Sequence, residues 1–305
     1  IANCGLFCGA DVDFVDTDPE TYNMWVERLA DKLQEAEKLG QLPKIVIPVH
    51  LTGQSAEMTQ IAELSKRYGF RIIEDASHAV GGQFEGRPVG DCRYSDITVF
   101  SFHPVKIITT GEGGMAMTND FEVAQQMRRL RSHGISRDAS ELQREPEGGW
   151  YYEQLDLGYN YRMTDMQAAL GTSQLSRIDE FVRRRRQLAR RYEEAFADVA
   201  LRRPAQHPDT QSSWHLYVIR MGGAVRNEVF QRLRASGIGV NLHYIPVPRQ
   251  PYYRRLGFDP AHWPEAELYY AEAMTLPLHP GLTEADRDIV IDAVSQAVRE
   301  VGADR

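Results

Sequence analysis

Short apolar runs alternate with helical patterns through the first half of the chain. Apolar residues recur at helical spacing over 21–39 and 56–68, and each pattern is followed by a glycine of the kind that ends helices, Gly40 and Gly69. Runs rich in β-branched and aromatic residues predict strands at 44–50, 70–75, 97–102 and 113–119. Short apolar strands separated by helices are typical of a mostly parallel central sheet with helices on both faces. The pattern therefore predicts an α/β fold.

The middle of the chain reads as helix, loop and helix. A helix is predicted over 121–134, and the polar stretch 136–150 lacks periodicity, as mobile loops do. One long helical pattern then extends from a cap signal at Thr164 to about Val199 and contains four consecutive arginines at 183–186. We expect these arginines to form a solvated face of that helix.

The composition shifts after the long helical pattern. The remaining strands and helices are predicted at 212–221, 225–237, 239–247 and 283–301. We therefore predict a large domain over 1–204 and a smaller C-terminal α/β domain over 205–305.

Composition and charge argue against some classes of function. The chain has 305 residues, with 35 Lys and Arg against 43 Asp and Glu and a net charge of −8. A negative net charge argues against general nucleic-acid binding, which needs a basic surface. No apolar run approaches the ~20 residues that a membrane-spanning helix needs. We therefore predict a globular protein with neither a nucleic-acid nor a membrane partner.

The three cysteines Cys4, Cys8 and Cys92 cannot all pair with one another. Cys4 and Cys8 lack the companion ligands of a zinc site, so we predict no metal site. Free thiols are typical of the cytoplasm, which is the predicted location. The chain opens at Ile1 with a small-residue helical pattern that runs straight into a strand pattern, so we expect it to begin inside a domain.

Lysine is scarce in this chain, and one lysine lies in an unusual setting. The chain has five lysines, and 107–305 contains none. Lys106 follows the predicted strand 97–102, in a small, hydroxylic and glycine-rich segment. Open α/β sheets bind ligands beyond the carboxyl ends of their strands. An amine there can lose its proton and act as a nucleophile, whereas arginine cannot. The alternative is an ordinary loop lysine.

Asp75 ends the predicted strand 70–75, so its carboxylate points to the same edge of the sheet, while Glu74 faces the other way. Pyridoxal phosphate needs a lysine to form an imine and an acid to keep its pyridine nitrogen protonated. Ser101 and the segment 109–111 add hydroxyls and backbone amides that suit a phosphate. Together these residues predict a pyridoxal-phosphate site, although Asp75 alone could be a cap at the end of its strand.

Four motifs resemble the DegT/DnrJ/EryC1/StrS family of pyridoxal-phosphate-dependent nucleotide-sugar aminotransferases, which have aminotransferase fold type I. They are EDASHAVGG (74–82), FSFHPVKIITTGEGGM (100–115), LGYNYRMTDMQAALG (157–171) and HYIPV (243–247). The resemblance extends over essentially the whole chain. It implies that family members carry a further N-terminal portion, with a phosphate-binding helix start and an aromatic residue against the cofactor ring.

The resemblance also implies residue roles. Lys106 would hold the cofactor as a Schiff base and Asp75 would bind its pyridine nitrogen. The other implied contacts are His78 near the phenolic oxygen, Ser101 on the phosphate, Asn160 on the phosphate of a neighbouring subunit, and His243 and Tyr244 near the sugar nucleotide. A shared site of this kind implies a homodimer. A related branch dehydrates sugars and has histidine where Lys106 stands, so the lysine favours transamination.

Within the family, HPVKIITTGEGG is most similar to the 4-aminotransferases of pseudaminic acid biosynthesis. The implied reaction is transamination of a UDP-4-keto-6-deoxy-N-acetylhexosamine with L-glutamate, for a bacterial surface glycan. Two alternatives stay open. One is an aminotransferase that acts on a dTDP- or GDP-linked keto sugar, at C3 or C4. The other is a truncated member without catalytic activity.

Several further side chains have no assigned role at this point. His50 follows a predicted strand, and His103 lies beside Ser101, so each is a candidate for the pocket or for simple packing. The aromatic residues 150–152 follow the polar loop and could form a lid or a dimer contact. The remaining histidines are interpreted as structural.

Overall fold

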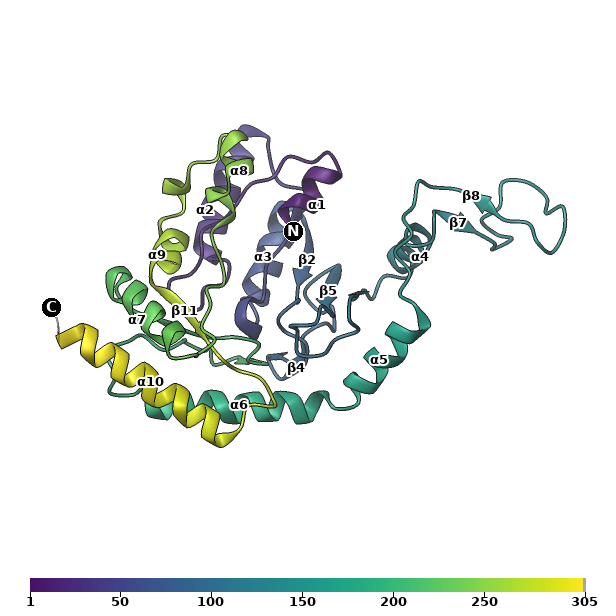
Figure 1. The fold of residues 1–305 in the computed structure, drawn as a ribbon. Coiled ribbons are helices and arrows are strands. Elements are labelled where there is room, and N and C mark those ends of the chain that lie inside the picture. The colour runs from purple at the N-terminus through teal and green to yellow at the C-terminus, as the bar shows by residue number, and fades with distance from the viewer. Residues whose placement is uncertain (304–305) are drawn as a thin grey trace.

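The structure is a computed structural model that describes residues 1–303 (Figure 1). Its α-helices are α1 (Ala2–Phe7), α2 (Val26–Leu39), α3 (Met58–Tyr68), α4 (Phe121–Leu130), α5 (Asp165–Leu175), α6 (Ile178–Ala195), α7 (Gly223–Ala235), α8 (Pro251–Arg255), α9 (Pro264–Glu272) and α10 (Glu284–Ala303). Its strands are β1 (Ile45–Val46), β2 (Arg71–Asp75), β3 (Gln83–Phe84), β4 (Arg87–Pro88), β5 (Ile97–Ser101), β6 (Gly114–Met117), β7 (Ile135–Ser136), β8 (Glu153–Gln154), β9 (Thr210–Gln211), β10 (Tyr217–Arg220) and β11 (Ala273–Leu276).

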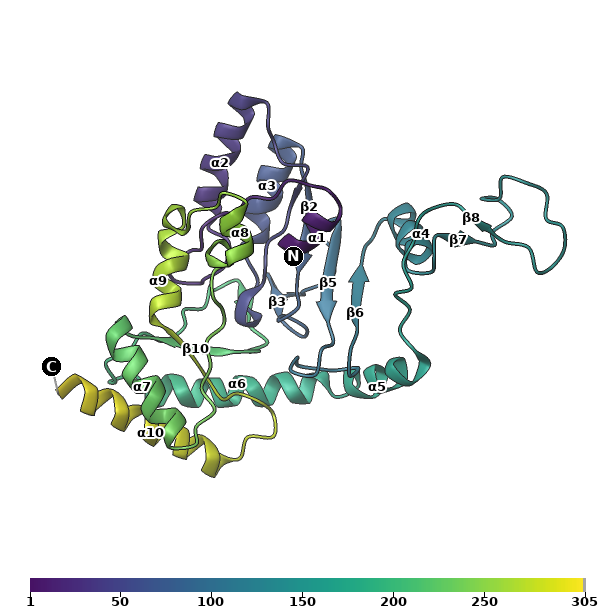
Figure 2. The same ribbon diagram turned by 45° about the horizontal axis from the view of Figure 1, so that its top comes forward.

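The central sheet has the strand order β1-β2-β5-β6. β1 pairs with β2 and β2 with β5 in parallel, which confirms the mostly parallel sheet. β6 is antiparallel to β5, because the short segment 102–113 turns the chain directly back without a crossover helix (Figure 2). The segment that makes this turn contains Lys106. Lys106 therefore lies in the connection at the carboxyl end of β5.

Helices α2 and α3 form where the apolar spacing predicts them, and both end at left-handed glycines, Gly40 at φ 67° and Gly69 at φ 79°. Their apolar faces pack with β1 and β2. The buried members of this core include Leu29, Leu33, Ile61, Phe70 and Ile72. This packing fixes one side of β2 firmly.

A second core lies between α6, α7, α10 and the antiparallel pair β10–β11. Its fully buried residues include Leu188 and Tyr192 of α6, Ile219 of β10, Met274 of β11 and Val294 of α10. The second half of α6 thus packs with the C-terminal elements. The predicted domain boundary between residues 204 and 205 stays a prediction.

The predicted single helix from Thr164 is wrong in its continuity. The chain forms α5 and α6 with a break at Ser176 and Arg177, and α6 ends at Ala195. The start is confirmed, because Thr164 and Gln167 form a capping box. The break lies where the surroundings change, since α5 is largely exposed while α6 packs on the second core.

The predicted solvated arginine face is also wrong. Only Arg183 of the four is exposed, and Arg185 is 4% exposed. The Arg185 guanidinium donates to the carbonyl oxygens of Trp214, His215 and Leu278, at 3.1, 3.2 and 2.8 Å. The run therefore ties α6 to segments far away in sequence. The local sequence shows that these residues are charged, but it does not show which carbonyl oxygens contact them in the fold.

The predicted strand over 239–247 does not form. Only Asn241 makes an isolated bridge, with Thr275 of β11, and the rest of the segment is irregular. Helices α8 and α9 and strand β11 were not predicted, because elements of five, nine and four residues are too short to show a clear apolar period.

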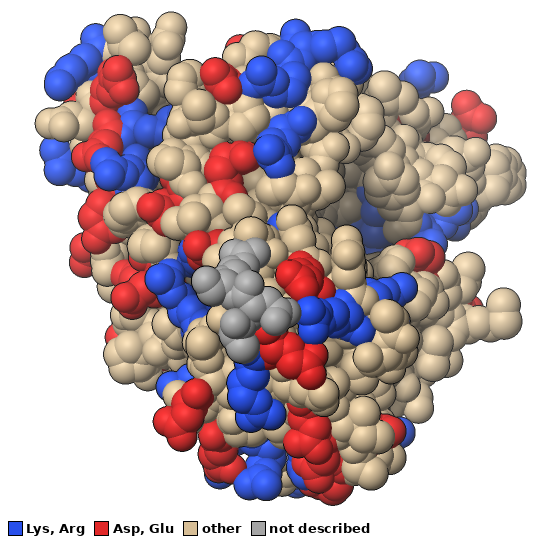
Figure 3. Space-filling model, turned by 60° about the vertical axis from the view of Figure 1, so that its left-hand side comes forward, with Lys and Arg blue, Asp and Glu red and all other residues tan. Residues whose placement is uncertain are grey.

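Helix α4 and the pair β7–β8 project from the body as an arm (Figures 1 and 2). The predicted loop 136–150 lies between the strands of this pair. On the face shown in Figure 3, basic side chains lie among acidic ones rather than in one continuous basic surface. Over residues 1–303, no helix is both long and apolar enough to span a membrane.

Candidate active site

Strand β2 separates two polar regions, because its last two side chains point to opposite sides. Glu74 is 5% exposed and accepts hydrogen bonds from His50 at 2.7 Å, from Thr98 at 3.0 Å and from Ser95. Burial alone raises the pKa of Glu74, but the hydrogen bonds and the nearby His50 outweigh it and lower the pKa. The alternation predicted for Glu74 and Asp75 is confirmed.

His50 belongs to the buried region with Glu74. Its side chain is 0% exposed, and its Nδ1 accepts from the backbone N–H of Ala56 at 3.0 Å. Nδ1 therefore carries no proton, and Nε2–H donates to the Glu74 carboxylate. Both ring nitrogens are used inside the fold, so His50 is a structural residue rather than a pocket residue.

Asp75 and Lys106 lie on the other side of β2. Asp75 ends β2, which lies between β1 and β5. Its backbone N–H donates to the carbonyl of Pro48 at 2.9 Å and its carbonyl accepts from the N–H of His50 at 3.0 Å, while its Oδ1 accepts from the N–H of Ser77 at 2.9 Å. Lys106 is half-buried in the turn after β5. Burial lowers the pKa of Lys106, while the negative charge of Asp75 acts in the opposite direction. The charge of Asp75 thus acts on the amine of Lys106, in agreement with the expectation that both lie at one edge of the sheet.

His78 follows Asp75 and is 7% exposed. Its Nε2 lies 3.4 Å from the hydroxyl of Tyr244, and its Nδ1 has no hydrogen-bond partner within the described part of the chain. Burial, followed by the positive charges of Lys106 and His243, lowers the pKa of His78 to about 3. His78 is therefore an uncharged imidazole at the edge of the same site.

His243 and Tyr244 come from the C-terminal part of the chain and approach the site from the other side. His243 Nδ1 lies 2.9 Å from the hydroxyl of Thr275, and its carbonyl oxygen accepts from the hydroxyl of Tyr269 at 2.7 Å. Burial and then the charge of Lys106 lower the pKa of His243. Burial and then Asp75 raise the pKa of Tyr244. The Tyr244 hydroxyl lies 3.4 Å from Nε2 of His78, so this segment lies at the edge of the site.

Ser101 ends β5, five residues before Lys106, and its hydroxyl accepts weakly from the N–H of His103 at 3.4 Å. His103 is exposed and lies 3.8 Å from Glu112. The turn closes through a hydrogen bond of 2.9 Å from the N–H of Lys106 to the carbonyl of His103. Ser101 and Lys106 therefore share one turn, whereas His103 points toward solvent.

Asn160 lies elsewhere. It bridges Ser132 at the end of α4 and is exposed on the arm. The structure therefore does not place Asn160 beside Lys106 within one chain. Of residues 150–152, Trp150 and Tyr152 are exposed, whereas Tyr151 is half-buried and its hydroxyl donates to Glu153 of β8 at 2.8 Å.

His215 is a residue that the sequence interpretation missed, because it was grouped with the structural histidines. It is 5% exposed, and its ring centroid lies 4.4 Å from that of His78. Burial lowers the pKa of His215, and His78, Lys106 and Arg185 act in the same direction. No sequence signal marks it, since contact with His78 spans more than a hundred residues of chain.

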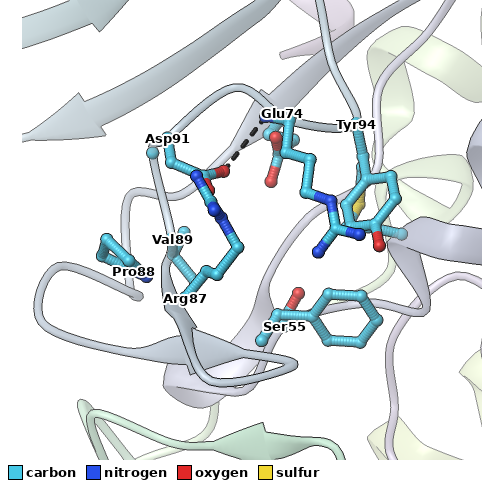
Figure 4. Close-up of a pocket in the computed structure, with 11 residues that line it drawn as sticks. Ser55, Glu74, Arg87, Pro88, Val89, Asp91 and Tyr94 are labelled. Atoms are coloured by element: carbon cyan, nitrogen blue, oxygen red, sulfur yellow. Dashed lines mark hydrogen bonds and ion pairs between the residues drawn. The ribbon is translucent and has the colours of Figure 1, made fainter.

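A small recess opens beside the β3–β4 turn (Figure 4). It is lined by Glu74, Arg87, Asp91 and Tyr94, among others, and thus lies on the Glu74 side of β2. Lys106, Asp75 and His78 are not among the described residues that line it. The recess is therefore separate from the cluster around Lys106.

The cluster around Lys106 fits pyridoxal phosphate. A half-buried amine with a lowered pKa suits covalent attachment to an aldehyde, and Asp75 would supply the acid that the pyridine nitrogen needs. The unpartnered Nδ1 of His78 shows that polar groups here are not all satisfied by the fold. Within residues 1–303, no group of three or more His, Cys, Asp or Glu side chains could hold a metal ion.

Comparison with known proteins agrees with this geometry. The model of the DegT/DnrJ/EryC1/StrS aminotransferase family matches residues 1–295. The spore coat polysaccharide biosynthesis protein SpsC of Bacillus subtilis is 38% identical over 310 residues, which cover 99% of this chain and 77% of SpsC. The resemblance inferred from the four motifs is confirmed.

Two solved structures have the same fold. The putative sugar aminotransferase Spr1654 from Streptococcus pneumoniae, in its PMP form, is 30% identical with a TM-score of 0.88, and the match covers 98% of this chain and 79% of that one. Helicobacter pylori PseC, an aminotransferase involved in the biosynthesis of pseudoaminic acid, is 28% identical with a TM-score of 0.87, and the match covers 98% and 76%. The predicted aminotransferase fold is confirmed.

Proposed function

We propose a reaction for this chain from one premise, which is that it belongs to the DegT/DnrJ/EryC1/StrS aminotransferase family. It is therefore a pyridoxal-phosphate-dependent sugar aminotransferase. The proposal concerns which residues carry the reaction and which sugar is aminated. The observation that carries it is the half-buried Lys106 amine of lowered pKa, close to the carboxylate that ends β2.

Lys106 is the proposed catalytic residue. Its Nζ would bond to the cofactor aldehyde, and after displacement by the amino donor it would take and return a proton. Because burial lowers the pKa of Lys106, a larger share of the amine is unprotonated and able to do both. When bound, pyridoxal phosphate supplies an electron sink and carries the amino group between the two substrates.

The other residues would bind and orient. Asp75 would hold a proton on the pyridine nitrogen, and the uncharged His78 would lie near the phenolic oxygen. Ser101 would bind the phosphate. His243 and Tyr244, which close the site from the C-terminal side, would contact the sugar nucleotide.

A homodimer is part of the proposal. Asn160 is exposed and bridges Ser132 beside α4, and from there it would reach the phosphate in the neighbouring subunit. Large apolar side chains around it and along α5 are exposed, which is typical of a surface that another protein covers. They are Leu157, Tyr159, Tyr161, Met166 and Leu170.

The proposed substrate is a UDP-4-keto-6-deoxy-N-acetylhexosamine, with L-glutamate as amino donor and a 4-amino sugar for pseudaminic acid as product. Similarity to PseC and to the polysaccharide protein SpsC supports a surface glycan. A cytoplasmic location is proposed with it, and the free thiols of Cys4, Cys8 and Cys92 agree with a reducing compartment. The second candidate is a dTDP- or GDP-linked keto sugar.

The experiment begins with cofactor titration of the purified protein. We expect a visible absorption band that borohydride abolishes, with the label on the peptide containing Lys106. The loaded protein is then incubated with nitrogen-15-labelled L-glutamate and UDP-, dTDP- and GDP-keto sugars in parallel. Mass spectrometry and NMR of the products should show labelled nitrogen at C4 of the UDP sugar.

Other outcomes have distinct meanings. Amination of only the dTDP or GDP sugars, or at C3, would replace the proposed substrate. A protein without an absorption band or product would favour the non-catalytic alternative. A band trapped on another residue would remove Lys106 from the proposal.

A further inference from the structure

Hydrogen bonds join the segment that precedes β10 to the loop at Thr52 and Gly53 and to the backbone of His78. Ser213 N–H donates to the carbonyl of Gly53 at 3.0 Å, and Leu216 N–H donates to the carbonyl of Thr52 at 3.2 Å. The hydroxyl of Ser213 donates to the carbonyl of His78 at 2.9 Å. Segments from three separate parts of the chain are thereby held together around His78.

Gly53 shows how close this packing is. A Cβ on Gly53 would lie 2.6 Å from the Ser213 hydroxyl oxygen. It would also lie 3.0 Å from the backbone nitrogen of His215 and 3.0 Å from the carbonyl oxygen of His78. Its φ of 107° also favours glycine. The backbones of His78 and His215 therefore have little freedom to move relative to one another.

The side chains of the two histidines then meet as rings. Their centroids lie 4.4 Å apart with an interplanar angle of 49°, and both side chains are more than nine-tenths buried. Each ring has an Nδ1 without a partner within the described residues. The Arg185 guanidinium donates to the carbonyl oxygens of Trp214 and His215, at 3.1 and 3.2 Å, and so holds the backbone that carries the His215 ring. The fold thus builds a rigid support behind His78.

We infer that His215 is a positioning residue, whose buried ring fixes the imidazole of His78 and keeps water from its inner face. This inference rests on the proposed function, in which His78 borders the cofactor. Because the His215 ring covers that inner face, the imidazole of His78 stays uncharged and keeps Nε2 toward Tyr244 and the site.

The charges around His78 act in the same sense. The titratable and charged groups that approach it are Lys106, His243, Tyr244, His215 and, behind His215, Arg185. Lys106 and His243 carry or can gain positive charge beside His78, which disfavours a proton on its ring. Exclusion of water by His215 adds to this effect.

The test follows the imidazole signals of His78 and His215 by NMR, as a function of pH, in the cofactor-free full chain. In the unaltered protein we expect His78 to stay neutral well below its ordinary pKa of 6.5, with nuclear Overhauser contacts between the two rings. His215→Ala should let water in and raise the pKa of His78 toward 6.5. His215→Phe should restore the low pKa, because a similar ring fills the space. His262→Ala, an exposed histidine, is the matched control.

Three results would overturn the inference, and the first two concern the titration of His78 and of His215 itself. One is a His78 titration that is the same in His215→Ala as in the unaltered protein. The other is a His215 imidazole that titrates near 6.5 without contacts to His78 in the unaltered protein, which needs no variant to fold. A His215→Phe protein that fails to restore the low pKa would equally contradict a role for the ring. Because the cofactor is absent, these outcomes are independent of whether Lys106 binds pyridoxal phosphate.

Discussion

The two sides of strand β2 differ in how well their polar groups are satisfied. On one side, Glu74 accepts from three side chains, and both nitrogens of His50 are bonded. On the other side, His78 and His215 each keep an unpartnered Nδ1, and the amine of Lys106 has a lowered pKa. Residues adjacent in sequence thus belong to regions of opposite character.

This difference in hydrogen bonding distinguishes the side of β2 that stabilises the fold from the side that we expect to bind a ligand. A buried polar group without a partner costs about 1–3 kcal/mol, so a fold keeps such groups where a ligand or a reaction uses them. The Glu74 side is complete without a ligand, whereas the Lys106 side is not. Variants on the two sides should therefore affect different measurements.

The largest effect is expected at Lys106. Lys106→Arg keeps a positive charge but not an amine that can lose its proton, so it should lower the transamination rate by about 10³-fold or more. Steady-state kinetics with the aminated sugar as readout checks this, and borohydride should leave no label. Lys66→Arg, at an exposed position on α3, should behave as the unaltered protein does. A Lys106→Arg protein with normal turnover would falsify the assignment.

Much of the first half of the fold follows from sequence. Helices α2 and α3 have apolar faces that match their period, and strand β2 ends at the acid that the sequence singles out. The Lys106–Asp75 pair was predictable because both follow parallel strands, whose carboxyl ends meet at one edge. Local pattern is enough where the site is built from adjacent strands.

The rest depends on distant contacts that no local pattern contains. Arg185 is buried because carbonyls from 214, 215 and 278 converge on it, although its sequence neighbours are all arginines. His215 reaches the site only through the segment that precedes β10. Segment 239–247 forms only an isolated bridge from Asn241 to Thr275, and its residues His243 and Tyr244 contact Thr275, Tyr269 and His78, all distant in sequence.

The next largest effects are expected from substitutions of Asp75 and Glu74, which are neighbours on β2. Asp75→Asn should lower the rate by about 10²-fold, because the pyridine nitrogen loses its proton-holding partner, while the free energy of unfolding changes little. Glu74→Gln should do the reverse and cost about 1–3 kcal/mol in unfolding free energy, since it weakens a buried network. Kinetics per folded molecule and denaturant unfolding measure the two quantities.

The pH dependence of the unfolding free energy further distinguishes the Glu74 variant from the Asp75 variant. Because the pKa of Glu74 is lower in the folded chain than its ordinary 4.5, its contribution to stability is present above pH 4.5 and is lost as the pH falls through the folded pKa. Unfolding of the Glu74→Gln protein should therefore depend less on pH in this acid range. Equal losses of rate in both variants would contradict the division of β2 into two regions.

The smallest effect compares two hydroxyls on β5. Thr98 is fully buried and donates to Glu74 at 3.0 Å, whereas Ser101 lies at the end of the strand next to the Lys106 turn. Thr98→Val should cost about 1 kcal/mol in unfolding free energy and leave cofactor affinity unchanged. Ser101→Ala should leave unfolding unchanged and weaken pyridoxal-phosphate affinity by about tenfold, since it removes a donor to a charged phosphate. Absorbance titration and denaturant unfolding on the same preparations measure both. If Ser101→Ala destabilised the chain while its affinity held, Ser101 would belong with Glu74, and the boundary between the two regions would have to move along β5.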